Sequence, residues 1–428
     1  MNAVFYTLGC KVNQYETESI KELFLVFGFT SDNNLRADII IINSCTVTAE
    51  SDRKTRQLLR KLRRENSDAI IVLTGCMVQA FPEISNELSE ADIIIGNKNP
   101  ALIIEKVLEF VAEKRHIFEY SEHKKGDLYN TPSISDFHER TRAFMKIEDG
   151  CDRFCSYCII PTARGRVRSR TLKDIKSEAE RMAENNFKEI VLVGINLSSY
   201  GKNTEFNICD AVETVASVNG IERIRLGSLE PDHITDEMLQ RLNAVEKFCP
   251  QFHLSLQSGC DETLLRMNRH YDSAFYKDLV NRIRKTFSNP SITTDIMVGF
   301  VGETDEEFNE NVKFAREIGF AKMHVFAYSK RSGTRAAQMN GHLTNAVKQE
   351  RAKIMGKIAN ELENEFLKSQ IGGIFPILFE TSEKGYYEGY APNYLKVLVK
   401  AENNLQGKIL NVKITEASDG YCYGSLIF

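Results

Sequence analysis

The stretch AFMKIEDGCDRFCSYCIIPTARGRVRSR, residues 143–170, decides how the rest of the chain is arranged. Residues 144–147, of which three are apolar, predict a strand, and the Asp-Gly step that follows predicts a turn. Cys151, Cys155 and Cys158 come next in a C-x3-C-x2-C spacing. Because one short loop carries all three thiolates, the stretch predicts a site for a single inorganic centre at the end of the strand.

This loop suits an iron–sulfur cluster, which cysteine thiolates hold and which normally takes four of them. With three protein ligands, one iron is left free to bind a substrate, as the open position of a catalytic zinc site does. A zinc ion completed by a distant Cys or His, or simple burial of the cysteines, are the alternatives. Tyr157, just before the last cysteine, makes the pattern more specific than an isolated C-x-x-C and favours the open cluster.

The first 118 residues alternate short apolar runs with helical segments, which predicts a parallel α/β domain. Cys10, Cys45 and Cys76 each come just after one of its first three strands. Because the carboxyl ends of parallel strands line one crevice, we expect a second three-thiolate site there. Burial of each cysteine as a small apolar residue is the alternative. The expected strands are 4–8, 39–43, 70–74 and 93–95, and the expected helices are 16–27, 51–66 and 100–114.

Residues 119–140 contain Pro, Ser and Gly with little periodicity and predict a linker. From residue 141 to 343 the alternation of strand and helix resumes in six longer units, which predicts a partial (β/α) barrel. Thr304 and Glu307 form the pattern of a helix capping box. The expected strands are 144–147, 190–194, 223–226, 253–256, 293–298 and 324–327, and the helices between them include 172–185 and 305–318.

The C-terminal part has a different texture. Residues 344–369 predict one long amphipathic helix, and residues 370–428 alternate apolar runs with Gly and Asn turns, which predicts a small antiparallel β-barrel. A module of this kind suits an OB-like RNA-binding domain, in which Lys396 would contact phosphate. The whole chain is therefore predicted to be α/β with three parts: a parallel α/β domain, a partial (β/α) barrel and a small β-barrel.

Composition narrows the class of protein. Of 428 residues, 42% are hydrophobic and 27% charged, and the longest apolar runs are too short to cross a membrane, so a disordered or membrane-bound protein is not indicated. The N-terminus carries no pattern of a secretion signal, so we expect a cytoplasmic protein whose ten cysteines serve metal or redox chemistry. With a net charge of −4, RNA contact requires local basic patches. The patch nearest the cysteine loop comprises Arg164, Arg166, Arg168 and Arg170.

The cysteine loop resembles the radical S-adenosylmethionine (SAM) superfamily. That resemblance implies a [4Fe-4S] cluster whose open iron binds the amine and carboxylate of SAM and whose reduction cleaves SAM to a 5′-deoxyadenosyl radical. Residues at the strand ends would then contact SAM, although each could equally be a hydrogen-bonding residue of the barrel. Besides Tyr157, the residues that the resemblance implies for SAM binding are Gly194, Glu230, Ser255, Gln257 and Asp295.

Taken together, the motifs of all three regions resemble the methylthiotransferases of that superfamily, and are most similar to the MtaB branch. The motifs are LGCKVNQYE (8–16), NSCTVT (43–48), TGC (74–76) and DGCDRFCSYCIIPTARGRVRSR (149–170). The resemblance implies two [4Fe-4S] clusters, of which the auxiliary one at Cys10, Cys45 and Cys76 holds the sulfur. It also implies a C-terminal TRAM domain that binds RNA.

This branch converts N6-threonylcarbamoyladenosine beside the tRNA anticodon to its 2-methylthio derivative, using two SAM. The resemblance further implies a reductant such as flavodoxin or ferredoxin, and leaves the sulfur donor unknown. Methylthiolation of isopentenyl-adenosine in tRNA, or of an aspartate in a ribosomal protein, is the alternative within the family. A zinc-containing RNA-binding protein without enzymatic activity is the alternative from another class.

Overall fold

The N-terminal sheet is built from strands that are buried on both faces. In the computed structural model, which describes residues 1–135, 141–202 and 204–427, five parallel strands follow one another in the order β1-β2-β3-β4-β5. Every residue of β2 and β3 is buried, because α1 and α4 cover one face and α2 and α3 the other. The elements are β1 (Ala3–Thr7), α1 (Lys11–Val26), β2 (Ile39–Ser44), α2 (Ala49–Glu65), β3 (Ile70–Gly75), α3 (Cys76–Ala80), the 3-10 helix Pro82–Glu87, β4 (Ile93–Ile95), α4 (Leu102–Glu113) and β5 (Ile117–Glu119).

The four strands predicted for this domain are confirmed within one residue, whereas β5 was not foreseen. The predicted boundary at residue 118 falls inside β5, and residues 136–140 of the predicted linker lie outside the described residues. Helix α1 begins five residues earlier than expected. It contributes Ile20 and Phe24 to the core of the N-terminal sheet, and Val12 and Tyr15 to the core of the next domain. One helix therefore joins the two domains.

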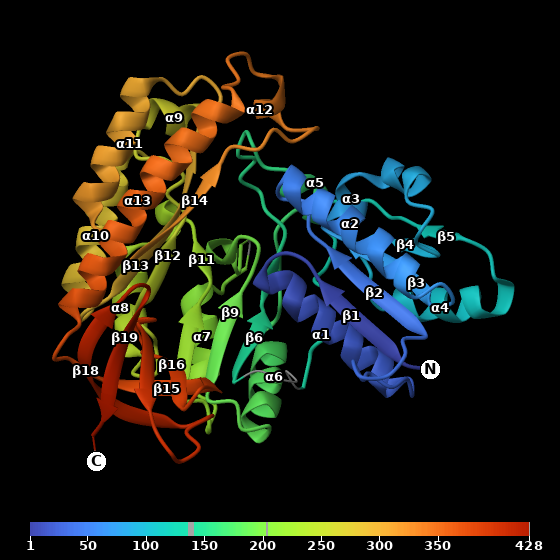
Figure 1. Ribbon diagram of the computed structural model, residues 1–428, viewed down its shortest axis with the longest axis horizontal. Helices are drawn as coiled ribbons and strands as arrows, with labels where there is room; N and C mark the ends of the chain where they lie inside the picture. Colours follow the sequence, from blue (N-terminus) through green and yellow to red (C-terminus); the bar gives the residue numbers. More distant parts are fainter. Residues whose placement is uncertain (136–140, 203, 428) are drawn as a thin grey trace.

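The central domain is an open barrel of parallel strands. Two sheets, β10-β9-β6 and β11-β12-β13-β14, meet where Gly227 separates β10 from β11, and this gives the six strand positions that the sequence predicts. Figure 1 shows the strands with α10, α11 and α13 outside them and the N-terminal sheet beside β6. The predicted capping box of Thr304 and Glu307 is present at the start of α11. No helix among the described residues is long and apolar enough to span a membrane.

Twenty helices and strands of the described residues make up this part of the chain. They are β6 (Arg142–Lys146), β7 (Glu148–Asp149), α5 (Ile160–Arg164), β8 (Arg168–Ser169), α6 (Leu172–Glu184), β9 (Glu189–Val193), the 3-10 helix Leu197–Ser199, α7 (Ile208–Ala216), β10 (Arg223–Leu226), β11 (Ser228–Leu229), the 3-10 helix Pro231–His233, α8 (Asp236–Ala244), β12 (Gln251–Leu254), α9 (Asp261–Arg266), α10 (Ser273–Thr286), β13 (Ser291–Val298), α11 (Asp305–Ile318), β14 (Lys322–Ala327), α12 (Arg335–Gln338) and α13 (Asn345–Ser369).

The C-terminal domain is a closed barrel of five strands in the order β15-β16-β17-β19-β18, which confirms the predicted small β-barrel, although β17 and β19 pair in parallel rather than antiparallel. It docks at the ends where the strands of the central barrel begin, through two arginines of β10. Arg225 donates to the carbonyl oxygens of Pro392 (2.8 Å) and Ala391 (3.3 Å), and its Nε donates to Glu189 (3.0 Å). The strands are β15 (Ile374–Glu383), β16 (Tyr386–Tyr390), β17 (Lys396–Lys400), β18 (Ile409–Ser418) and β19 (Tyr421–Leu426).

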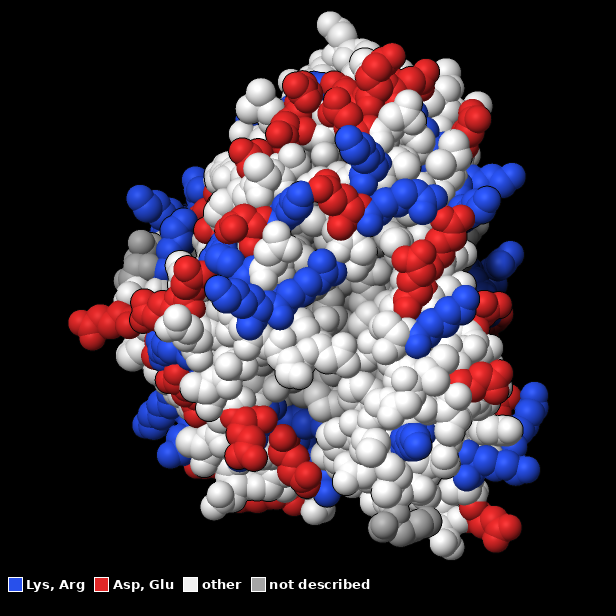
Figure 2. Space-filling model, turned by 90° about the vertical axis from the view of Figure 1, so that its left-hand side faces the viewer, with Lys and Arg blue, Asp and Glu red and all other residues white. Residues whose placement is uncertain are grey.

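Charge is unevenly distributed over the outer face of the molecule. Figure 2 shows acidic side chains gathered at the top of the face that carries α10, α11 and α13, the end at which α11 begins with three acidic residues in its first turn. Over the rest of this face, separate groups of basic and acidic side chains surround a broad uncharged area. Because phosphate is anionic, the acidic end is unsuited to RNA binding.

We expect Arg225→Met to loosen the C-terminal barrel, because the substitution removes one of the three arginines that share Glu189 and leaves two carbonyl groups without their donor. Removing one partner of a buried ion pair costs about 3–5 kcal/mol, whereas an exposed pair is worth about 1 kcal/mol or less. The measurement is the denaturant midpoint of unfolding, with cleavage between α13 and β15 by added protease as a second readout. Arg282→Met, which removes an exposed pair with Asp236, is the control. Equal midpoints for the two variants would contradict the assigned docking contact.

Candidate active site

The N-terminal cysteines meet at the carboxyl edge of their sheet. Cys45 and Cys76 directly follow β2 and β3, and Cys10 is the residue that precedes α1. Burial raises the pKa of the Cys76 thiol to about 12; Arg164 opposes this shift, whereas Cys45 and Cys10 add to it. Gly9 (φ +116°) is required here, because a Cβ would lie 2.8 Å from the Cβ of Cys45. The three sulfurs therefore lie close enough to act on one another.

The second triad occupies the loop between β7 and α5. The N–H of Cys158 donates to the carbonyl of Cys155 (3.0 Å), which keeps these two residues in one tight turn. Burial raises the pKa of the Cys151 thiol to about 12, with the N–H of Arg153 lowering it and Cys155 raising it further. Gly150 (φ +87°) lets the loop leave the strand, since a Cβ there would lie 2.0 Å from the carbonyl oxygen of Arg166.

The spacing of the sulfurs bears on which inorganic group each triad fits. A tetrahedral zinc ion holds its sulfurs about 3.8 Å apart, given a Zn–S bond of about 2.3 Å. Within the described residues, the groups of three ligand atoms that lie within 4.8 Å of one another do not include either cysteine triad. The wider spacing and the all-sulfur donor set fit an iron–sulfur cluster, whose irons are spread over a larger core.

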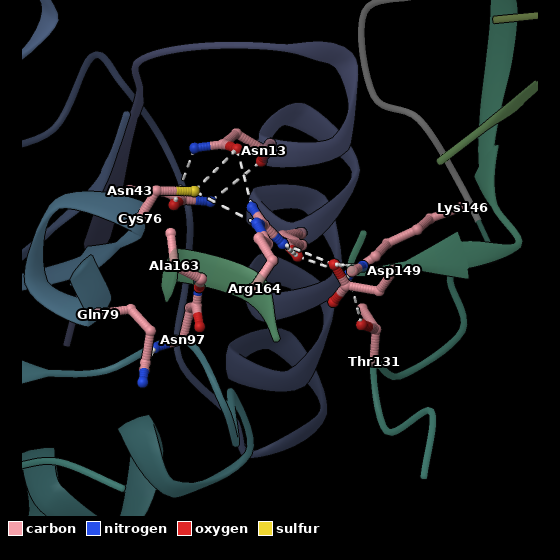
Figure 3. Close-up of polar contacts among 12 residues, drawn as sticks. Asn13, Asn43, Cys76, Gln79, Asn97, Thr131, Lys146, Asp149, Ala163 and Arg164 are labelled. Atoms are coloured by element: carbon pink, nitrogen blue, oxygen red, sulfur yellow. Dashed lines mark hydrogen bonds and ion pairs between the residues drawn. The ribbon is translucent and has the colours of Figure 1, made fainter. Parts of the chain in front are cut away.

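A buried network of charges runs from Cys76 of the first triad to Asp149, which precedes the loop of the second triad (Figure 3). Arg164 of α5 donates from Nε to the Cys76 sulfur (3.2 Å) and forms a bidentate pair with Glu16 of α1. Lys146 of β6 donates to the same Glu16 (2.6 Å) and to Asp149 (2.8 Å), one residue before the loop of the second triad. Although burial raises the pKa of Asp149, the cations Lys146, Arg164 and Arg168 hold it well below its usual range. The network therefore stays charged at neutral pH.

The structure brings several of the predicted SAM residues beside the second triad. Glu230 accepts from Arg269 (2.5 Å), and the same guanidinium donates to the Cys155 sulfur (3.3 Å) and to the carbonyl of Ser255 (2.9 Å). Tyr157 packs edge to face on Phe300. Arg269 was not predicted, since a single arginine in the segment MNRHY carries no sequence signal.

The remaining SAM candidates lie deeper in the barrel. Gln257 (φ +70°) pairs through its backbone with Asp295 and Met297, so its main-chain role is to extend the sheet. The Asp295 carboxylate lies 3.4 Å from Nε2 of His253 on the neighbouring strand. Gly194 follows β9, where a Cβ would lie 2.6 Å from the Glu148 carboxylate. Contact of these residues with SAM stays a prediction.

Two cavities open at the site. The larger, about 520 Å³, is lined by Cys10 and Lys11 from the N-terminal domain, Gly194 and Asp295 from the central barrel, and Tyr394 and Lys396 from the C-terminal barrel. The smaller, about 310 Å³, is lined by Cys155 and Cys158 together with His123, Arg166 and Arg335. The larger cavity is thus a place where all three domains contribute side chains beside an exposed cysteine.

Three of the arginines predicted to contact RNA are buried inside the protein. Arg164, Arg168 and Arg170 are only 1%, 7% and 5% exposed. Each has a carboxylate partner, which for Arg168 is Asp149 (3.0 Å) and for Arg170 is Glu178 (2.6 Å). The prediction that these three contact RNA is therefore wrong, and their role is internal.

The other two predicted RNA contacts, Arg166 and Lys396, keep part of their side chains exposed. Arg166 is half-exposed and lies over the Phe154 ring at 4.5 Å from its centroid. Lys396 lines the larger cavity and pairs with Glu388 (2.8 Å). RNA contact by these two residues stays a prediction.

Known proteins are similar to this chain in sequence and in fold. The Radical SAM superfamily matches residues 145–315, and the uncharacterized protein family UPF0004 matches residues 2–96. The threonylcarbamoyladenosine tRNA methylthiotransferase MtaB of Bacillus subtilis is 37% identical over 99% of this chain and 96% of its own length. A tRNA-2-methylthio-N(6)-dimethylallyladenosine synthase of Caldicellulosiruptor saccharolyticus is 34% identical over 98% and 91%. The radical SAM methyltransferase TsrM of Kitasatospora setae shares the fold, with a TM-score of 0.58, 13% identity and coverage of 90% of this chain and 80% of that one.

Arg164→Met should destabilise the iron-free protein strongly, because Glu16 then loses its bidentate partner while it stays buried. We expect a loss of about 3–5 kcal/mol in the free energy of unfolding. Arg166→Met, two residues away and half-exposed, should cost about 1 kcal/mol or less. Denaturant unfolding of both variants measures the difference. Similar losses would show that the Arg164 network does not hold the domains together.

His123 should make stability depend on pH. Burial, followed by the nearby Arg168, lowers the pKa of His123 to about 4, whereas an unfolded histidine titrates near 6.5. As pH falls from about 6.5 to 4, the unfolded chain takes up a proton that the folded chain does not, so stability is lost through this window. His123→Gln removes the titration and keeps a side chain that can pair with Asn97. A stability difference between the two proteins that stays constant from pH 7.5 to 4 would contradict the assignment.

Proposed function

Because the chain belongs to the radical SAM methylthiotransferases, we propose that it transfers a methylthio group to carbon 2 of N6-threonylcarbamoyladenosine beside the anticodon of tRNA. The chain is a tRNA methylthiotransferase, and its cofactors are SAM and iron–sulfur clusters. The choice of nucleoside is the proposed part, since relatives named for threonylcarbamoyladenosine and for dimethylallyladenosine both match over nearly the whole chain. The sequence is somewhat more similar to the former, at 37% against 34% identity.

The cavity of about 520 Å³ is the observation that carries the proposal. It connects Cys10, a ligand we assign to the auxiliary cluster, with Gly194 and Asp295, which we assign to SAM. A base inserted there would lie between the group that supplies sulfur and the cofactor that activates the carbon. Such an arrangement is what a transfer between two bound groups requires, because it holds the reacting atoms near one another.

The proposed assignment of clusters follows the two triads. Cys151, Cys155 and Cys158 would hold the [4Fe-4S] cluster that supplies the electron for SAM cleavage, and Cys10, Cys45 and Cys76 would hold the auxiliary cluster that carries the sulfur. Arg269 and Arg164 each donate an N–H to a cysteine sulfur, one in each triad. Hydrogen bonds of this kind stabilise the thiolate form and orient the ligand.

Other residues would position the two triads and the RNA relative to one another. Lys146 and Arg164 pair with Glu16 between the N-terminal domain and the barrel, and these buried pairs would position one triad relative to the other. Tyr394 and Lys396 border the cavity on the side of the C-terminal barrel, where we propose that the anticodon loop enters. A one-electron donor such as flavodoxin or ferredoxin completes the reaction, which we place with its tRNA substrate in the cytoplasm.

The experiment uses the anaerobically purified protein, SAM, a strong reductant and anticodon stem-loop RNA that carries either threonylcarbamoyladenosine or dimethylallyladenosine. We expect mass spectrometry of the nucleosides to show the 2-methylthio product from the first RNA only. Product from the dimethylallyl RNA alone would move the chain to the other substrate.

Two variants separate the roles of the triads within the same assay. Cys76→Ala should lose most of the N-terminal iron and all methylthio product, yet still cleave SAM to 5′-deoxyadenosine, because the second triad lies in another domain. Cys155→Ala should lose SAM cleavage. Iron content of each folded variant is the control. Normal methylthio product from soluble Cys76→Ala protein would refute the two-cluster assignment.

A further inference from the structure

Lys11 occupies a particular place in the larger cavity. It is the first residue of α1 and follows directly on Cys10, so its side chain leaves the backbone beside one of the thiols of the N-terminal triad. Both residues are exposed, although they lie in a cavity that three domains surround. The Lys11 ammonium lies 5.8 Å from the centroid of the Phe144 ring on β6. The side chain therefore extends from the N-terminal domain across to the barrel.

The ammonium of Lys11 has no counter-ion on the described part of the chain. Two other lysines line this cavity, and both are paired, Lys322 with Glu363 (3.0 Å) and Lys396 with Glu388 (2.8 Å). No carboxylate oxygen of residues 1–135, 141–202 or 204–427 lies within 4.0 Å of the Lys11 ammonium. The charge of Lys11 is therefore available to a ligand.

The carboxylates around the cavity are committed elsewhere. Asp295 faces His253 at 3.4 Å, and Glu189 is shared by Arg142, Arg223 and Arg225. Burial lowers the pKa of Lys11, and the cations Arg142 and Arg225 lower it further, whereas Tyr394 and Glu189 raise it. This end is consequently suited to an anion.

We propose that Lys11 binds the carboxylate of the threonylcarbamoyl group and so selects this nucleoside over the dimethylallyl one. The inference rests on the proposed function and names the residue that reads the substrate. A threonyl carboxylate is anionic and accepts charge-assisted hydrogen bonds, whereas a dimethylallyl group is neutral and accepts none. A site built around an unpaired cation thus favours the threonylcarbamoyl nucleoside, because the cation gains a partner from the carboxylate and gains none from the dimethylallyl group.

The chemistry of adenine agrees with this placement. Carbon 2, which receives the methylthio group, and carbon 6, which carries the substituent through its amine, flank the same ring nitrogen. A protein that presents the sulfur and the cation side by side, as consecutive residues Cys10 and Lys11 do, can meet both positions of one base. The ribose and phosphates attach at the opposite side of adenine. An RNA phosphate is therefore the less suitable partner for Lys11 in this position.

The test is the affinity of the iron-loaded full-length protein for three anticodon stem-loop RNAs, which carry threonylcarbamoyladenosine, dimethylallyladenosine or plain adenosine at the same position. The wild type should bind the first RNA most tightly. Lys11→Met should weaken binding of this RNA by about 10-fold or more and leave the other two unchanged, since it removes one charge-assisted hydrogen bond. Lys11→Arg should keep most of the preference. Lys21→Met, on the same helix but away from the cavity, should behave as the wild type.

The affinities of Lys11→Met for the three RNAs decide between a carboxylate and a phosphate as the partner of Lys11. If Lys11→Met keeps the full preference for the threonylcarbamoyl RNA, the proposal is overturned. If it weakens all three RNAs equally, Lys11 contacts a phosphate and the proposal is overturned as well. Iron content equal to that of the wild type shows that the neighbouring triad is intact. If the wild type itself has no preference and methylthiolates only the dimethylallyl RNA, the proposed function fails, which is a different result from failure of Lys11 alone.

Discussion

The bidentate ion pair between Arg164 and Glu16 is the interaction on which the arrangement of the site depends. It crosses from the N-terminal domain to the barrel, and both side chains are buried. A charge that stays buried after it has lost its partner is costly, so a shift that separates Arg164 from Glu16 without admitting water is strongly unfavourable. Lys146 of the barrel also pairs with Glu16, and its ammonium pairs with Asp149 as well. Two sets of cysteines that are distant in sequence are held in one geometry as a result.

A buried arginine also positions the C-terminal barrel, which forms one wall of the larger cavity. Arg225 is almost fully buried and binds carbonyl oxygens that belong to the loop between β16 and β17. These are backbone groups, so the contact depends on the path of the chain rather than on the identity of the side chains in the loop. The wall of the cavity that Tyr394 and Lys396 form is therefore placed by the barrel beneath it. The cavity exists only when all three domains are assembled.

Much of this organisation could be predicted from the sequence, because strands and cysteines have local signals. Apolar runs located the strands of both sheets, and the position of each cysteine after a strand predicted the triad of Cys10, Cys45 and Cys76. The strand β5 was missed because three residues with an exposed Phe118 carry little periodicity. The role of Arg164 was missed for a different reason. Its partners Glu16 and Cys76 are far away along the chain, and four arginines at alternate positions suggest a surface patch unless the fold is known.

The position of α5 over Cys76 has a consequence for how the protein is made. Cys76, Ala80, Ile159 and Ala163 form one small buried cluster, so the segment that covers this cysteine is translated well after it. At about 5–20 residues per second, α5 leaves the ribosome on the order of 5 to 20 seconds after Cys76 does. During that interval the N-terminal sheet can fold while its cysteines lack this cover. Iron delivery to the nascent chain would meet an open triad, whereas in the finished protein Cys45 and Cys76 are buried and Cys10 is the exposed member of the triad.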